Sequence, residues 1–211
     1  GAVVTNSGTW EVRSDAAMSW IGNGAKAVFL NGGLFSKTGG GGATVFNETA
    51  FHNSGTVRAE RGTLNLDAGG NSSGAFETVT HALVAFAGGT HTVSAGGVIR
   101  GAGRVQVAGV LNFQGSSVAG ATLELLGGSS STFGAPVSVS GAVSVSGTGV
   151  FSNAVTAGSV SVAGSGTFYG AVSAPGVGSV TGTATFNGSA DLGVMSWTGS
   201  GGFNGTATLA G

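Results

Sequence analysis

The chain has 211 residues, a net charge of −1 and only 7% charged residues, whereas a typical globular domain has about 25%. This composition lacks the basic stripe that nucleic-acid binding needs, and no apolar run reaches the roughly 18 residues of a membrane helix. The chain contains no Cys, so disulfides and Cys-based metal sites are excluded.

The N-terminal half contains a repeated four-residue motif. Asn6-Ser-Gly-Thr9 recurs as Asn53-Ser-Gly-Thr56, and each copy leads into a predicted strand, at 10–13 and 57–59. The offset between the copies suits two repeats of about 23 or 24 residues. The only helix signal, at 14–18, is a single capped turn that is too short to predict a helix.

Glycine-rich and acidic segments do not match known ligand motifs. The run 39–42 predicts a flexible turn, because a phosphate loop requires a following Lys-Ser/Thr and a helix. A calcium-binding solenoid repeat requires Gly-Gly-x-Gly-x-Asp, and neither Asp67 nor Asp191 lies in that pattern. We therefore expect no bound cofactor at these positions.

The densest cluster of polar side chains lies in the middle of the first half. It comprises His52, Arg58, Glu60, Arg61 and Asp67. Glycosidases use two carboxylates about 5 Å apart or somewhat further, which makes Glu60 and Asp67 a candidate pair. The alternating charges of 58–61 are typical of a solvated strand face, so we predict no catalytic residues. The alternative is a β-helix that binds or cleaves polysaccharides, with its groove near 52–91.

A longer pattern covers this cluster. Residues 51–70 read Asn-x-Gly-Thr-hydrophobic, then Gly-Thr-Leu-x-Leu, then a Gly pair, and 88–96 repeat part of it. Over roughly residues 1–115 the pattern resembles bacterial surface β-solenoids, the passengers of autotransporters and filamentous-haemagglutinin-like adhesins. The resemblance implies a right-handed β-helix, export from the cell, and an adhesive or structural use.

Three titratable side chains are candidate metal ligands. Glu77, His81 and His91 are widely spaced, and neither His lies in a zinc motif. We therefore predict no metal site, with each His exposed or satisfied within the fold.

The C-terminal half has a regular aromatic repeat. Its members follow one another in steps of roughly 17 to 20 residues: Phe113, Phe133, Phe151, Phe168, Phe186 and Phe203. A second apolar column follows about 11 or 12 residues behind them: Leu125, Val145, Val162, Val180 and Trp197. Period-two alternation forward from each Phe predicts a strand that begins there. The wider step from Phe86 to Phe113 predicts a loop or a longer coil.

A fixed period with short strands and Gly corners predicts an all-β chain folded as a parallel β-solenoid. A β-sandwich of hairpins has no reason to keep one period over five steps. We predict one continuous solenoid over 1–211, with coils of about 17–24 residues that shorten toward the C-terminus. Residues 1–112 would form longer, charged, less regular coils, and 113–211 regular coils of about 17–20 residues carrying the Phe ladder.

The charges are unevenly distributed. All Asp, Glu, Lys and Arg residues except Asp191 lie at or before Glu124. A surface of Ser, Thr, Gly and Ala is poorly protected against self-association. Such a surface is glycosylated, covered by a neighbour, built to associate, or simply neutral. The N-glycosylation acceptor pattern occurs at four sites: Asn47, Asn71, Asn187 and Asn204.

Two of these residues share a repeat position. Asn187 and Asn204 follow successive members of the Phe repeat, which favours an outward Asn ladder or a turn. The Thr pairs of 183–185 and 206–208 suggest an ice-binding face. We predict against one, because the other repeats place Ser, Tyr or Val there.

The leading functional hypothesis is a noncatalytic extracellular β-solenoid on a bacterial cell surface. The segment 202–211 begins another repeat without a polar cap, although solenoids need capping repeats. We therefore expect a stretch of a longer fibre, or a subunit that associates end to end or laterally. A cell-surface or glycan ligand is a further expected partner. The other alternative, a phage or secretion-apparatus fibre, predicts a trimer.

Overall fold

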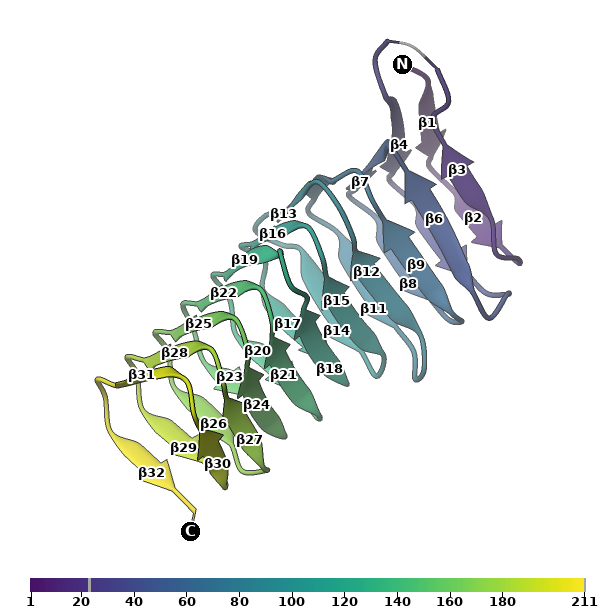
Figure 1. Ribbon diagram of the computed structural model, residues 1–211. Helices are drawn as coiled ribbons and strands as arrows, with labels where there is room; N and C mark the ends of the chain where they lie inside the picture. The colour runs from purple at the N-terminus through teal and green to yellow at the C-terminus, as the bar shows by residue number, and fades with distance from the viewer. Residues whose placement is uncertain (23, 211) are drawn as a thin grey trace.

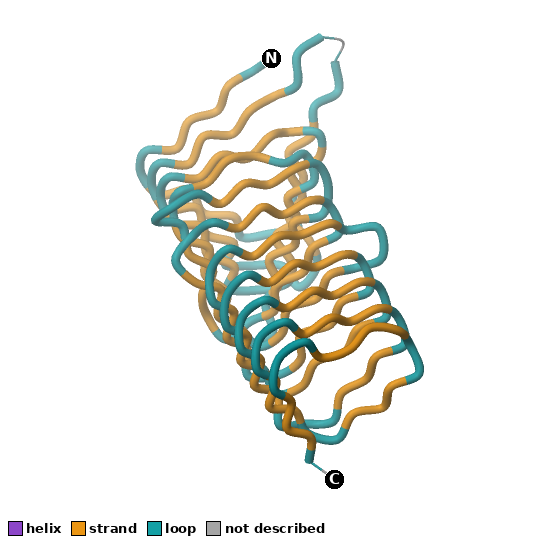
Figure 2. Tube along the Cα trace, turned by 90° about the vertical axis from the view of Figure 1, so that its left-hand side faces the viewer, coloured by secondary structure: helices purple, strands orange, loops and turns teal. Residues whose placement is uncertain are grey.

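The computed structural model describes residues 1–22 and 24–210, and it confirms an all-β parallel solenoid. The chain winds through three parallel sheets in turn, so each strand pairs with the strand three places earlier in the chain, as β4 does with β1 (Figure 1). Each coil contributes one strand to each sheet, except that the last described coil has strands only in sheets A and B, and loops turn the corners between them (Figure 2). The two termini lie at opposite ends of the stack (Figure 1).

The strands are short, mostly three to five residues. Sheet A contains β1 (Val3–Asn6), β4 (Ala27–Asn31), β7 (Thr49–Asn53), β10 (Gly70–Ser72), β13 (Thr90–Val93), β16 (Val110–Phe113), β19 (Ser130–Phe133), β22 (Thr148–Phe151), β25 (Ser165–Phe168), β28 (Thr183–Phe186) and β31 (Ser200–Phe203). Sheet B contains β2 (Thr9–Val12), β5 (Leu34–Lys37), β8 (Thr56–Ala59), β11 (Ala75–Thr78), β14 (Val98–Gly101), β17 (Ser117–Gly120), β20 (Val137–Val139), β23 (Val155–Thr156), β26 (Val172–Ala174), β29 (Ala190–Leu192) and β32 (Ala207–Leu209). Sheet C contains β3 (Ala17–Ser19), β6 (Ala43–Asn47), β9 (Thr63–Leu66), β12 (Leu83–Phe86), β15 (Arg104–Val107), β18 (Thr122–Leu125), β21 (Ala142–Val145), β24 (Ser159–Val162), β27 (Gly178–Val180) and β30 (Met195–Trp197).

The coils shorten along the chain. Equivalent residues are 25 apart at Asn6 and Asn31, and 22 apart at Asn31 and Asn53. The last coils are shorter, with an offset of 17 between Asn187 and Asn204. The two copies of the Asn-Ser-Gly-Thr motif are therefore separated by two unequal coils, and the intervening copy is the altered sequence at 31–34.

The Phe repeat forms a continuous column in sheet A. Each of Phe113, Phe133, Phe151, Phe168, Phe186 and Phe203 is register partner of the next. All are buried except Phe203, which is half-buried in the last coil. Every one of them is the last residue of its strand, so the prediction that a strand begins at each Phe was wrong. The alternation that suggested it continues across the corner into sheet B.

The rings in the middle of this column stack face to face. Phe133, Phe151, Phe168 and Phe186 stack with centroids 4.8–4.9 Å apart and ring planes within 7° of parallel. This separation equals the strand spacing of about 4.8 Å. Adjacent strands ordinarily twist by roughly 20–25°, and flat sheets are usually held by stacking of this kind. The near-parallel rings therefore indicate little twist between strands β19 and β28.

The second apolar column lies in sheet C. Leu125, Val145, Val162, Val180 and Trp197 are successive register partners. The first four are buried, and Trp197 is half-buried against Phe203 at a centroid distance of 5.4 Å. The two columns face each other across the core, which explains the nearly constant spacing between them in the sequence.

Phe86 does not belong to the Phe113 column. It lies in sheet C, paired with Leu66 and Val107, so the step from Phe86 to Phe113 is no measure of coil length. The Thr pairs that suggested an ice-binding face also lie apart. Thr183 and Thr185 belong to sheet A, and Thr208 belongs to sheet B, so comparing the two pairs as one repeat position was wrong.

Candidate binding groove

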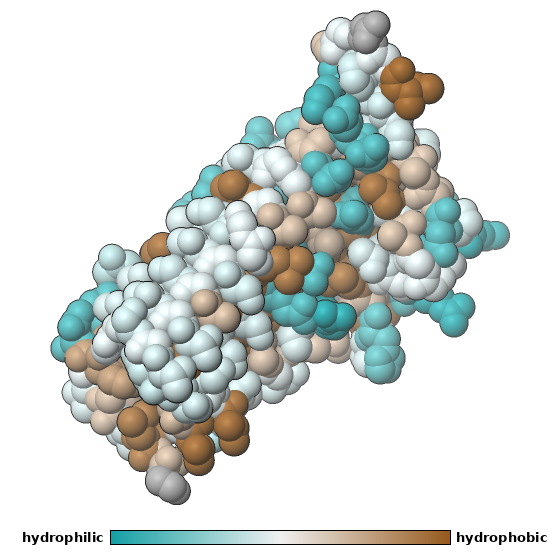
Figure 3. Space-filling view, viewed as in Figure 1, coloured by the Kyte–Doolittle hydropathy of each residue, from teal (hydrophilic) through white to brown (hydrophobic). Residues whose placement is uncertain are grey.

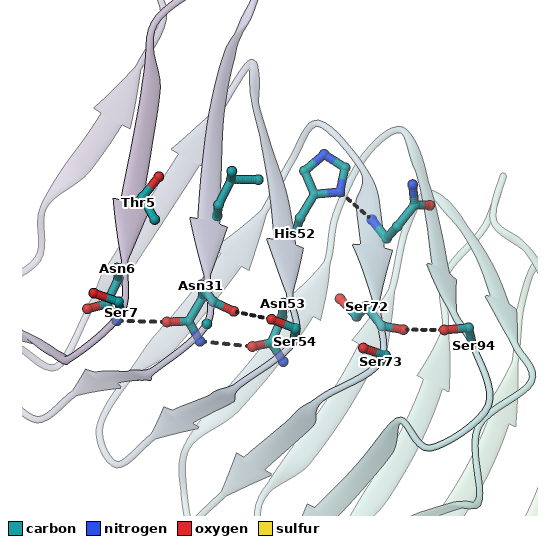
Figure 4. Close-up of a pocket in the computed structure, with 13 residues that line it drawn as sticks. Thr5, Asn6, Ser7, Asn31, His52, Asn53, Ser54, Ser72, Ser73 and Ser94 are labelled. Atoms are coloured by element: carbon teal, nitrogen blue, oxygen red, sulfur yellow. Dashed lines mark hydrogen bonds between the residues drawn. The ribbon is translucent and has the colours of Figure 1, made fainter.

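A surface depression crosses the first five coils at the corner between sheets A and B. It has a volume of about 420 Å³. The same three register positions of four successive coils line it, at 5–7, 30–32, 52–54 and 71–73, and Ser94 of the fifth coil closes one end. Figure 4 shows these residues in rows that run from coil to coil. The groove therefore runs along the solenoid axis.

A ladder of buried amides forms the floor of the groove. Asn6 Nδ2 donates to Asn31 Oδ1 at 2.7 Å, and Asn31 Nδ2 donates to Asn53 Oδ1 at 2.8 Å (Figure 4). Each amide also donates to the carbonyl of the first residue of the sheet B strand in the following coil: Leu34 for Asn6, Thr56 for Asn31 and Ala75 for Asn53. Buried polar groups must be paired in this way, because an unpaired one costs roughly 1–3 kcal/mol.

Serine hydroxyls line the corner side of the groove. Ser54 Oγ donates to the Asn31 carbonyl at 3.4 Å, and Ser94 Oγ donates to the Ser72 carbonyl at 3.2 Å. A hydroxyl has one proton and two lone pairs. Since each of these two protons is used within the fold, the two oxygens offer acceptors to a ligand.

The outward side of the groove is formed by Leu30, His52 and Asn71, which are equivalent positions of three successive coils. The backbone N–H of Asn71 donates to His52 Nδ1 at 3.0 Å (Figure 4). In the neutral ring this bond places the proton on Nε2, which is then a donor. Leu30 adds an exposed apolar surface.

Among the described residues, no Asp, Glu, Lys or Arg lines the groove. The charged side chains lie on neighbouring faces in pairs, such as Arg104 Nη2 with Glu124 Oε1 at 2.7 Å. Arg58, Glu77 and Arg100 alternate in register on the outer face of sheet B. The groove therefore combines polar groups with apolar surface and carries no charged side chain in its described lining.

The candidate carboxylate pair is not brought together. Glu60 follows β8 and Asp67 follows β9, so strand β9 separates them. Four residues of strand span roughly 13 Å, beyond the separation used in glycoside hydrolysis. Glu60 instead accepts from Ser36 Oγ and pairs with Arg58, and exposed Arg61 follows at the corner.

The candidate metal ligands also lie apart. His81 is exposed in a turn with a positive φ of 68°, and Glu77 pairs with Arg100. His91 is buried, with Nε2 3.1 Å from the Leu66 carbonyl, and burial lowers its pKa from 6.5 to about 4. Across residues 1–22 and 24–210, no three His, Asp or Glu side chains cluster closely enough to hold a metal ion.

No sequence pattern predicts the ion pair between buried Lys37 and exposed Asp15. Lys37 is fully buried, and its Nζ donates to Asp15 Oδ1 and to the Gly39 carbonyl, each at 2.9 Å. Asp15 Oδ2 accepts from the Gly42 N–H at 2.9 Å, so the predicted glycine turn wraps this carboxylate. The hydrogen bonds from Lys37 and Gly42 lower the pKa of Asp15. The pair joins the loop between β2 and β3 of the first coil to the end of β5 in the second coil.

The four glycosylation-pattern residues have different environments. Asn47 and Asn71 are exposed, and Asn71 lies in the groove. Asn187 is half-buried and Asn204 is exposed. Asn204 Nδ2 donates to Asn187 Oδ1 at 2.8 Å, which forms the outward Asn contact between successive coils.

Comparison of this chain with protein-family models, curated proteins and solved structures finds no match. Within the described part of the chain, no helix has the length and apolar character needed to cross a membrane.

The sequence signal that would have located the groove is the altered motif copy at Asn31-Gly-Gly-Leu34. Placed between the copies at Asn6 and Asn53, it gives three Asn residues in consecutive coils. Without it, the two recognised copies are separated by a whole coil, and no contact between them is expected.

Proposed function

We propose that this chain is a noncatalytic extracellular β-solenoid with a structural or adhesive role, forming a segment or subunit of a bacterial surface fibre. The observation that carries the proposal is the continuity of three parallel sheets from β1 to β32 around one uninterrupted core. This architecture makes an elongated rod whose length is set by the number of coils. A rod suits a role in which distance from the cell surface matters.

The flat aromatic stack supports a rigid rod. Ring planes within 7° of parallel over β19–β28 leave little freedom for bending between coils. Each coil is also joined to the next by backbone hydrogen bonds in all three sheets, except the last described coil, which is joined through sheets A and B. Such coils contact only their neighbours, so the stability of the stack adds up along its length.

Surface character supports association. Hydrophilic side chains gather over the N-terminal half of the face in Figure 3, whereas the C-terminal half is mostly pale, with apolar residues at its end. The last strands expose or half-expose Val194, Trp197, Phe203 and Leu209. A surface with so few charged side chains is poorly protected against self-association.

The Asn-x-Gly-Thr pattern supports a bacterial surface location, because it is the feature shared with autotransporter and filamentous-haemagglutinin-like adhesins. In this chain the pattern has a physical role. Its Asn supplies the buried ladder, and the Gly-Thr step begins the next strand of sheet B.

Electron microscopy combined with analytical ultracentrifugation over a concentration series tests the proposal. We expect straight rods that grow into filaments with an axial repeat of about 4.8 Å. A monomer at every concentration would contradict the filament, and a discrete trimer would favour the phage or secretion-apparatus fibre. Release of reducing ends from polysaccharides, abolished by Glu60→Gln or Asp67→Asn, would contradict the noncatalytic assignment.

A further inference from the structure

We propose that the groove at the corner of sheets A and B binds a neutral glycan chain extended along the solenoid axis. The inference rests on the proposed extracellular adhesive role and names the ligand class of one site in it. The lining repeats coil by coil at 5–7, 30–32, 52–54 and 71–73. A ligand that uses this repetition is itself a polymer of similar units.

The direction and spacing of the groove favour an extended polymer. Equivalent lining positions are one coil apart, which is about 4.8 Å between strands. Five coils therefore present a track roughly 20 Å long. A short ligand would use one or two coils, whereas an oligosaccharide of several residues would contact every coil.

The polar groups in the groove match sugar hydroxyls. His52 Nε2 is a donor, the Asn71 amide offers both a donor and an acceptor, and the Ser54 and Ser94 oxygens keep free lone pairs. Hydroxyls of a sugar both donate and accept, so they satisfy all of these groups. Leu30, with 38% of its surface exposed, supplies an apolar contact for a sugar C–H face.

Other polymers fit less well. An anionic polymer requires cations, and no Lys or Arg of the described chain lines the groove. An extended peptide binds most readily by adding a strand to a free sheet edge. Of the strands that line the groove, β1 is the end strand of sheet A, but β4, β7 and β10 are each paired on both sides and offer no free edge. Along these three coils the groove offers neutral polar groups and no free backbone edge, which favours a neutral glycan as the ligand.

The test uses the 211-residue chain made without N-glycosylation, because Asn71 fits the acceptor pattern. Isothermal titration calorimetry measures binding of neutral hexasaccharides of β-1,4-glucose, β-1,4-N-acetylglucosamine and α-mannose, with hexagalacturonate as the anionic comparison. The variants are His52→Ala, which removes the donor, and Asn71→Asp, which adds a charge without changing shape. Asn112→Asp is the matched control, since Asn112 occupies the same outward column of sheet A beyond the groove.

We expect at least one neutral hexasaccharide to bind, and His52→Ala and Asn71→Asp each to weaken it by about tenfold. Asn112→Asp should bind glycan like the unmodified chain, because Asn112 lies outside the groove. Its new carboxylate can still accept from Thr132 Oγ1, so the local structure should be retained. Equal melting temperatures of the variants show that the fold is retained, and if His52→Ala unfolds then Asn71→Asp carries the test.

The proposal is overturned if no neutral glycan binds at millimolar concentration, if hexagalacturonate binds more tightly, or if Asn112→Asp weakens binding as much as Asn71→Asp. These outcomes are separable from the wider role. Rods and filaments seen by electron microscopy would uphold the structural role even if the glycan site failed.

Discussion

The last inward position of each sheet A strand has opposite chemistry in the two halves of the molecule. We call this line the corner column. Its N-terminal members are Asn6, Asn31, Asn53 and Ser72, Val93 follows, and Phe113 begins the Phe ladder. One backbone position is thus filled by hydrogen-bonded amides in one half and by stacked rings in the other.

The position two residues earlier compensates for the difference. In the N-terminal half it holds Phe29 and Phe51, which stack at 5.2 Å with planes 9° apart. In the C-terminal half it holds Gly149, Gly166 and Ala184. Each of these coils therefore carries one large ring on the inner face of sheet A. A coil can therefore hold a polar residue at the last inward position of its sheet A strand when an aromatic ring occupies the position two residues earlier.

The rings of the C-terminal half lie over the small residues beside them. A Cβ added at Gly149 would stand 2.7 Å from Leu125 Cδ1 and 3.0 Å from Phe151 Cε2. The φ of this glycine is not in the left-handed region, so space and not backbone conformation requires it. Protein interiors are close-packed, and such a site has no room for a methyl group.

The largest expected effect comes from placing a polar side chain in the apolar, C-terminal part of the corner column. Phe168→Asn leaves a cavity between two rings and a buried amide without a partner. We expect the free energy of unfolding to fall by about 5 kcal/mol in urea titrations. Phe168→Leu, which keeps the site apolar, should cost about 1 kcal/mol. Equal losses in the two variants would show that the corner column tolerates either chemistry.

The second prediction concerns His91, at the junction between the two halves. Burial lowers its pKa from 6.5 to about 4, so between these pH values the unfolded chain binds a proton that the folded chain does not. The free energy of unfolding should therefore fall as the pH falls through this window, by about 3 kcal/mol in total.

The variant His91→Leu isolates this contribution. The Leu66 carbonyl also accepts a hydrogen bond from the Ala87 N–H at 2.8 Å, so it stays paired when the imidazole is removed. Urea titrations of both proteins from pH 7 to 4 measure the difference. The same pH dependence in the two proteins would rule out His91 as its source.

The third prediction places an apolar side chain in the polar, N-terminal part of the corner column. Asn31→Leu keeps the approximate shape but removes the donor to Asn53 Oδ1 and to the Thr56 carbonyl. We expect a loss of about 2 kcal/mol, because these acceptors stay buried. The matched control is Asn187→Leu, which breaks the outward contact with Asn204 and should cost under about 0.5 kcal/mol. The ladder would have no stabilising role if the two losses were alike.

The smallest effect tests the space beside the rings. Gly166→Ala would place a Cβ 3.0 Å from Phe168 Cε2 and 3.3 Å from Val162 Cγ2, at a cost of about 1–2 kcal/mol. Gly127→Ala is the control, since no described atom lies within 4 Å of its Cβ position. Adding Phe168→Leu to Gly166→Ala should recover part of the loss. Strict additivity of the two changes would contradict the proposed packing.

Much of the fold was predictable because identical residues stack in a parallel solenoid. The Phe spacing and the second apolar column behind it both follow from this rule. The prediction failed where a column changes residue type. Phe86 was compared with Phe113 because both are Phe, although they lie in different sheets. The sequence predicted a groove near 52–91, whereas the observed groove is lined by residues between 5 and 94. The first two coils were missed because the motif copy at Asn31 lacks its Ser and was not recognised.

The sequence by itself determined the repeat, the parallel solenoid and the loss of charge toward the C-terminus, because these are properties of residues at fixed spacing. Only the tertiary structure decided that the Asn and Phe residues share one column, that Lys37 reaches Asp15, and that a neutral groove crosses five coils. Those relations join residues of adjacent coils, and the register between unequal coils follows from how each corner packs.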